Sequence, residues 1–218
     1  MATPFSKGPY AVVIGDVVRS RTHEDQRELI RLVATTLEWV NRRVGSAQAL
    51  EMTVGDEFQG AYGDLGVALD AALLVRLRLA GICDLRFGLG WGEITAFDPD
   101  RAPMAQSGSA WWAAREALEE IVTRVRKRQW PNSVRTWLVG APDPTQRLLN
   151  ALLMCRDELL AKMDERDARI ALGLFLNERQ EDVANALGIS QPSVARRQVE
   201  NGANAIYRAH EALRGLVP

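Results

Sequence analysis

The stretch RQEDVANALGISQPSVARRQVENG, residues 179–202, contains the clearest structural signal in the chain. Its first half places three small or apolar residues on one helical face, namely Val183, Ala184 and Leu187. Gly188 follows them and tolerates the left-handed conformation that ends many helices. Ser190 is a good N-cap for a second helix, and Pro192 fits in the first turn of such a helix, where an N–H would have no partner. The pattern predicts two short helices joined by a tight turn.

This predicted pair of helices resembles the helix-turn-helix of sigma-factor region 4 and of many bacterial repressors. In that motif the second helix enters the major groove, where its polar side chains contact bases and phosphates. The outer face should carry six such residues here, namely Ser190, Gln191, Ser193, Arg196, Arg197 and Asn201. Val194 and Val199 should anchor the helix to the core. We therefore expect binding to double-stranded DNA, although helical hairpins with two surface arginines also occur in proteins that never touch DNA.

Helical patterns flank this segment on both sides and cover residues 148–163, 167–176 and 203–213. No strand pattern follows Val139, and Pro142 and Pro144 are typical of a linker. We expect a first domain over 1–141 and an all-helical domain over 142–218. Because one helix-turn-helix reads only a few base pairs, we also expect a homodimer.

The first 141 residues alternate between strand and helix patterns. Strand patterns cover 10–14, 85–94 and 133–139, a hairpin with a turn at Gly55 and Asp56 covers 48–62, and helical patterns cover 24–44, 65–80 and 109–128. We expect the strand over 85–94 to be broken by its three glycines. The order predicts an α+β domain with helices on a mostly antiparallel sheet, related to the ferredoxin-like layout.

Three short motifs in this domain carry acidic residues. Asp16 lies in VVIGDVVRS at the end of the first strand, Asp56 and Glu57 lie in VGDEF at the hairpin, and Glu93 lies in RFGLGWGEI. These motifs resemble class III nucleotidyl cyclases, and VGDEF resembles the signature of GGDEF diguanylate cyclases. The resemblance implies that Asp16, Asp56 and Glu57 hold divalent cations such as Mg²⁺ that bridge the phosphates of a purine nucleotide. The residues alone also allow a plainer role, because Asp often caps strand ends and turns.

Other positions depart from the cyclase pattern. Arg115, in QSGSAWWAAREAL, stands for the arginine that steadies the transition state in cyclases, but Trp111 or Trp112 replaces the expected asparagine. Met52 stands where the purine-selecting lysine is expected. The metal contacts therefore match the cyclase pattern while the base and ribose contacts depart from it, which favours nucleotide sensing over catalysis, and we assign no catalytic residue.

Nucleotide binding is expected from two groups of residues. Arg19 and Ser20, followed by Arg21, leave the first strand where they can hold a phosphate, although polar residues there are often just a solvated loop. Trp112 and Arg115 would contact the base and the ribose or phosphates, although paired tryptophans on a helix more often pack in a core or at a subunit interface.

The order of these motifs along nearly the full chain is similar to that of the SatD family, which implies a cyclase-like fold joined to a DNA-binding end. We therefore expect a dimeric transcription regulator whose first domain senses a nucleotide or a cyclic nucleotide. An active nucleotidyl cyclase is one alternative. A DNA-binding protein whose first domain serves only as a dimerisation scaffold is another.

The composition argues against several other classes. The formal net charge of -1 is unlike that of a protein that coats nucleic acid along its whole surface. Cys83 and Cys155 form no Cys-x-x-Cys pair, and His23 and His210 lack partners at zinc-ligand spacing, so we expect surface histidines and neither zinc nor haem. The apolar run near the start is too short for a signal peptide or a membrane span, so we expect a cytoplasmic protein.

Overall fold

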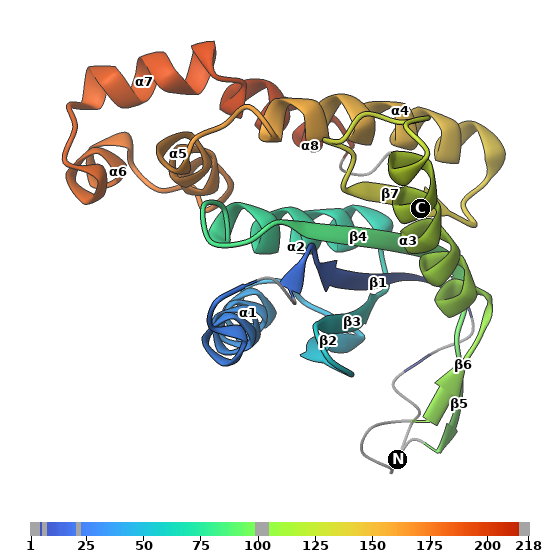
Figure 1. Cartoon of the computed structure of the whole chain (residues 1–218). Coiled ribbons are helices and arrows are strands. Elements are labelled where there is room, and N and C mark those ends of the chain that lie inside the picture. The colour runs from blue at the N-terminus through green and yellow to red at the C-terminus, as the bar shows by residue number, and fades with distance from the viewer. Residues whose placement is uncertain (1–4, 6–7, 21–22, 99–104, 214–218) are drawn as a thin grey trace.

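The computed structural model describes the chain except residues 1–4, 6–7, 21–22, 99–104 and 214–218. The fold is mixed α and β: a five-stranded sheet is covered by helices on both faces, and a helical lobe projects from one end (Figure 1). The strands are β1 (Pro9–Val17), β2 (Gln48–Met52), β3 (Glu57–Tyr62), β4 (Leu85–Glu93), β5 (Thr95–Asp98), β6 (Ala105–Ser107) and β7 (Thr136–Val139). The helices are α1 (Gln26–Asn41), α2 (Leu65–Arg78), α3 (Ser109–Arg126), α4 (Asp143–Leu160), α5 (Glu165–Phe175), α6 (Gln180–Leu187), α7 (Gln191–Glu200) and α8 (Ala203–Leu213).

The five-stranded sheet has the order β2-β3-β1-β4-β7. All neighbouring strands are antiparallel except β4 and β7, which are parallel, so the prediction of a mostly antiparallel sheet is confirmed. β1 continues to Val17, beyond the predicted end of the strand. Asp16 therefore lies inside β1, opposite Glu57 on β3 and Arg86 on β4.

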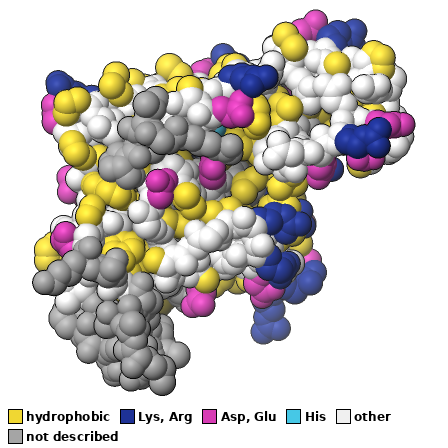
Figure 2. All heavy atoms as spheres, turned by 180° about the vertical axis from the view of Figure 1, so that it is seen from behind, with side chains coloured by type: hydrophobic (Ala, Val, Ile, Leu, Met, Phe, Trp, Pro, Cys, Tyr) yellow, Lys and Arg dark blue, Asp and Glu magenta, His cyan; other side chains and the backbone are white. Residues whose placement is uncertain are grey.

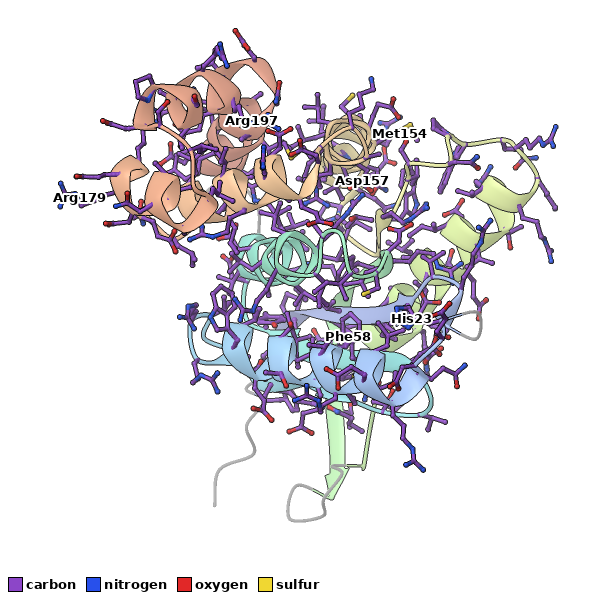
Figure 3. The ribbon with its side chains drawn as sticks, turned by 60° about the vertical axis from the view of Figure 1, so that its left-hand side comes forward. His23, Phe58, Met154, Asp157, Arg179 and Arg197 are labelled. Carbon is purple, nitrogen blue, oxygen red and sulfur yellow. The ribbon has the colours of Figure 1, made fainter. Side chains whose placement is uncertain are left out.

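Helices α1 and α2 cover one face of the sheet (Figure 1). Each begins at an aspartate whose carboxylate accepts a backbone N–H: Asp25 from Glu28 and Asp64 from Val67, both at 2.9 Å. Phe58 of β3 is fully buried beneath these helices (Figure 3). Local capping and burial together fix where both helices start.

Helix α3 lies on the opposite face of the sheet and touches β4 almost directly. Gly88, Gly90 and Gly92 alternate along β4 on the side that faces α3. A Cβ at Gly90 would lie 2.0 Å from the carbonyl oxygen of Ala110 and 2.3 Å from the amide nitrogen of Ala114. The expectation that these glycines break the strand is wrong: β4 is continuous, and its missing side chains let the backbone of α3 rest on the sheet.

An asparagine closes each edge of this sheet. At the β7 edge, Asn150 of α4 accepts from the N–H of Leu138 at 2.9 Å and donates to its carbonyl at 2.8 Å. At the β2 edge, Asn41 of α1 bonds in the same two ways to Leu50, both at 2.9 Å. These side chains satisfy backbone groups for which an edge strand offers no neighbouring strand.

Helix α4 is further tied to β7 by Asp157, which is fully buried between them (Figure 3). Its carboxylate accepts from the backbone N–H groups of Arg135 and Thr136 at 2.6 and 2.7 Å and pairs with Arg76 of α2 at 2.5 Å. Arg156, also buried, donates to the hydroxyl of Thr136 at 2.7 Å. A polar network thus joins α2, α4 and β7.

The helices after residue 141 share the core of the sheet. Pro142 and Pro144, expected in a linker, instead lie at the start of α4, where proline is well tolerated. The core under α1 and α2 also includes Leu153 of α4, Leu172 of α5 and Ile206 of α8. Of the helices after residue 141, α6 and α7 contribute no described residue to this core, and they lie at the projecting end of the molecule (Figure 1).

The two histidines have different environments. His23 is exposed, as predicted. His210, expected on the surface, is only 4% exposed, because α8 packs against α2 and α5 and turns this residue inward. Its ring nitrogens lie 3.0 Å from Asp70 and 3.3 Å from Arg156.

Among the described residues, no helix combines the length and apolar character needed to cross a bilayer.

Candidate functional site

The acidic residues of the predicted metal site lie close together at one end of β1 and β3, on the side of the sheet that α3 covers. Asp16 faces Glu57 in the strand register, and Asp56 precedes Glu57 in the β2–β3 turn. The pKa of Asp16 is affected by the negative charges of both neighbours, which places all three within electrostatic range. The structure thus brings Asp16, Asp56 and Glu57 to the same end of the sheet.

Each of two carboxylates in this cluster is held by an arginine. Arg86 donates to both carboxylate oxygens of Asp16 at 2.9 and 2.7 Å. Arg115 of α3 donates in the same bidentate way to Glu57 at 2.9 and 2.7 Å. Bidentate pairs of this kind are among the stronger hydrogen bonds in proteins. The site is therefore a cluster of two acid–arginine pairs.

The two pairs differ in their electrostatics. Burial raises the pKa of Asp16 above its ordinary value, even though the hydrogen bond and charge of Arg86 act in the opposite direction. The hydrogen bond from Arg115 lowers the pKa of Glu57, which is more exposed to solvent. The folded environment therefore favours the charged form of Glu57 and disfavours that of Asp16, as the opposite directions of their pKa shifts show.

The arrangement does not fit a divalent cation as it stands. Hard cations need free carboxylate oxygens, and both oxygens of Asp16 and of Glu57 accept from arginine. Among the described residues, no group of three or more His, Cys, Asp or Glu side chains is placed to hold a metal ion. Metal binding by Asp16, Asp56 and Glu57 stays a prediction, and a cation there would compete with Arg86 and Arg115 for these carboxylates.

A hollow of about 600 Å³ lies beside the Asp16 pair. Four arginines line it, namely Arg19, Arg86, Arg126 and Arg135, together with Asp84 and Asn132. Arg135 pairs with Asp84 at 2.6 Å, and Arg126 is exposed on the last turn of α3. We call this feature the arginine hollow. Its charge suits an anion such as a phosphate.

The predicted nucleotide-binding residues are not all brought together. Arg19 lines the arginine hollow and has a left-handed backbone, with φ of 58°. The carbonyl of Ser20 accepts from Gln26 at 3.3 Å in the turn before α1. Arg115 is engaged by Glu57, and Trp112 is 69% exposed on the first turn of α3. Arg21 lies outside the described residues.

Helices α6 and α7 have the geometry that their sequence predicts. Gly188 adopts the left-handed conformation, with φ of 63°, and the hydroxyl of Ser190 caps α7 by accepting from the N–H of Ser193. Val183 and Val194 are buried in a small core shared with α5. The α6–α7 segment is therefore a tight helical hairpin.

One residue of α7 that was predicted to lie in the core is exposed in the structure. Val199 is 70% exposed, whereas Gln198 is buried and accepts from Gln180 of α6 at 2.7 Å. Val194 faces inward, and four residues later the helix presents position 198 to the same side. Val199 comes one position later, so its side chain points away from the core and toward solvent.

The outer face of α7 is smaller than predicted. Ser190, Gln191 and Arg196 are exposed, and Ser193 is half-buried. Arg197, expected to face outward, instead pairs with Asp164 at 2.5 Å and Asp167 at 2.8 Å at the start of α5. It lies on the inner side of α7 (Figure 3).

Asn201 also contacts α5, since it donates to the carboxylate of Asp167 at 2.9 and 3.0 Å, although Asn201 itself is exposed. Asp167 is itself buried. Arg197 and Asn201 therefore both tie α7 to α5; the expectation that Arg197 faces outward is wrong, whereas Asn201 is exposed as expected. The acidic start of α5 was visible in the sequence as DERD, residues 164–167, but its pairing depends on the tertiary structure.

Comparison with known proteins supports one relationship. The sequence model of the SatD family matches residues 10–217 of this chain. No protein with a curated description matches.

Proposed function

The chain belongs to the SatD family, and we propose on that premise that it is a DNA-binding transcription regulator that senses a nucleotide. The exposed face of α7 is the observation that carries the DNA-binding part. The acid–arginine cluster and the arginine hollow support the nucleotide-sensing part.

The α6–α7 segment is proposed to act as a helix-turn-helix, with α7 as its recognition helix. Gln191 and Arg196 are the exposed side chains able to form paired hydrogen bonds with a base. Ser190 and the N-terminal turn of α7 would contact a phosphate. The segment lies at the projecting end of the molecule, where a duplex can approach it without meeting the sheet (Figure 1). Recognition of an operator would use two copies of the chain, since one such helix reads few base pairs.

Strands β1 to β4 with α1 and α2 follow the β-α-β-β-α-β order of the ferredoxin-like layout, which supports the proposed likeness to nucleotidyl cyclases. We propose that the phosphates of a nucleotide bind in the arginine hollow, near Arg19 and Arg126. Because arginines occupy the carboxylates of Asp16 and Glu57, the proposal assigns sensing rather than catalysis to this domain.

DNA binding is tested by sequencing the genomic fragments that the purified chain retains, followed by affinity measurements on the enriched site. Arg196→Gln should weaken binding by about 1–3 kcal/mol and relax the preference at one base position. Arg208→Gln, at an exposed position of α8, serves as the matched control and should leave the affinity unchanged. Equal affinities of wild type and Arg196→Gln would reject α7 as the recognition helix.

Nucleotide sensing is tested by calorimetric titration with ATP, GTP and cyclic nucleotides. Arg126→Gln should weaken binding without unfolding the protein, because Arg126 is exposed. Product analysis after incubation with Mg²⁺ or Mn²⁺ distinguishes sensing from catalysis. Turnover that Asp16→Ala abolishes would show an active cyclase instead.

A further inference from the structure

A second hollow, of about 740 Å³, lies where the projecting lobe meets the sheet and its helices. The residues that line it include Trp39 of α1, Arg43 just after α1, Arg78 at the end of α2, Arg169 of α5 and Leu187 of α6. Its walls therefore come from both sides of the junction. In the view of Figure 2, basic side chains gather on the body just below the lobe.

Positive charge is concentrated in this junction hollow. The guanidinium carbons of Arg43 and Arg78 lie 3.9 and 4.4 Å from the centroid of the Trp39 ring, so cation–π contacts hold both near one indole. Partial burial lowers the pKa of Arg78, and the charges of Arg43 and Arg169 lower it further. The positive charges beside Arg78 thus disfavour its own charge, in a space where an anion would be stabilised.

The acidic side chains of the junction hollow leave this charge largely uncompensated. Glu178 pairs with Arg169 at 2.6 Å, and Glu165 also lines the hollow. In the part of the chain that the structure describes, neither Arg43 nor Arg78 forms an ion pair with a carboxylate. Their side chains are exposed and able to reach a ligand.

We propose that the junction hollow binds a small phosphorylated molecule whose phosphate contacts Arg43 and Arg78. Guanidinium groups donate paired hydrogen bonds that match phosphate oxygens. Apolar walls, such as those formed by Leu172 and Leu187, would cover the organic part of the ligand. Because α1 and α6 both contribute, a bound ligand would hold the α6–α7 segment against the sheet domain. The site shares no residue with the arginine hollow and does not depend on the proposed function.

Isothermal titration of the full chain with pyrophosphate, AMP and ATP tests this site. We expect at least one of these probes to bind the wild type, and the double variant Arg43→Gln/Arg78→Gln to bind at least about tenfold more weakly. Arg31→Gln, at an exposed position of α1 outside the hollow, is the matched control and should bind as the wild type does. Circular dichroism checks that the double variant stays folded.

The outcomes separate this site from the proposed function. Arg126→Gln should leave binding at the junction hollow intact, whereas it should weaken a ligand of the arginine hollow. Lack of binding by all three probes overturns the inference, as does a loss of binding that follows Arg126→Gln alone. If the double variant instead weakens only DNA binding, the arginines contact a duplex backbone and the small-ligand site is rejected.

Discussion

Asn150 bonds to both backbone groups of Leu138, with its amide oxygen 2.9 Å from the N–H nitrogen and its amide nitrogen 2.8 Å from the carbonyl oxygen. Asn150→Ala would leave both buried groups without a partner, so we expect the free energy of unfolding to fall by about 2–4 kcal/mol. Urea denaturation followed by circular dichroism measures this change. Leu148→Ala, at an exposed position of α4, should cost less than about 0.5 kcal/mol, and equal losses in both variants would contradict the assigned role.

The contact between β4 and α3 should not tolerate a methyl group. Gly90→Ala would place its Cβ 2.0 Å from the carbonyl oxygen of Ala110, a backbone atom that cannot move without displacing α3. We expect a loss of about 3 kcal/mol or more in the free energy of unfolding. Gly45→Ala is the matched control, because a Cβ there would have no neighbour within 4 Å. A Gly90→Ala protein as stable as Gly45→Ala would refute the close packing.

Arg197 and Arg196 should affect different properties. Arg197→Gln removes two ion pairs and leaves the buried carboxylate of Asp167 with Asn201 as its remaining side-chain partner, so we expect a stability loss of about 1–3 kcal/mol. Arg196→Gln should leave thermal unfolding unchanged, because its contact with Glu200 is long, at 3.9 Å, and exposed. Differential scanning calorimetry compares the two. The reverse order of stabilities would show that the inner and outer faces of α7 are wrongly assigned.

The two thiols should react at different rates. Burial and the neighbouring charge of Asp84 raise the pKa of Cys83 to about 11, whereas Cys155 is exposed. At neutral pH we expect two phases with a disulfide reagent, the slower one at least about tenfold slower, because the thiolate is the reactive form. Cys155→Ser should remove the fast phase. Removal of the slow phase by that variant would contradict the burial of Cys83.

Stability should depend on pH through Glu57. The hydrogen bond from Arg115 lowers the pKa of Glu57 in the folded state. A lowered carboxyl pKa stabilises the fold above the ordinary pKa of glutamate, and this contribution is lost as the pH falls through the folded-state pKa. Glu57→Gln should therefore be less stable than wild type near neutral pH, and the difference should shrink on acidification. A difference that grows toward acid pH would contradict this sign.

The main elements were predictable from the sequence because their signals are local. The apolar spacing of α1 identifies its buried face, the apolar run of α2 indicates a helix buried on most sides, and Asp25 and Asp64 cap the two helices in the structure. Strands β5 and β6 were not predicted, because strands this short carry no clear periodicity. The sequence alone does not distinguish glycines that break a strand from glycines that make room for a helix packed on it, as those of β4 do. The small residues Ala110 and Ala114, four apart on α3, are the signal that would have distinguished these cases.

The candidate site was only partly predictable, for a similar reason. Motifs located Asp16 and Glu57, but the pairing with Arg86 depends on the register of β4 against β1. Likewise, the partners of Arg197 lie about thirty positions earlier in the sequence, so no local pattern reveals them. Charge pairs between distant segments require the tertiary structure.

The asparagines at both edges of the sheet limit how two chains can associate. At Leu50 and Leu138 the outward N–H and carbonyl groups are already bonded to Asn41 and Asn150. A strand from a second molecule would have to displace these side chains before it could pair there. Edge-to-edge pairing of the five-stranded sheet should therefore be disfavoured at these positions, so that this sheet should resist growth into a continuous intermolecular ribbon.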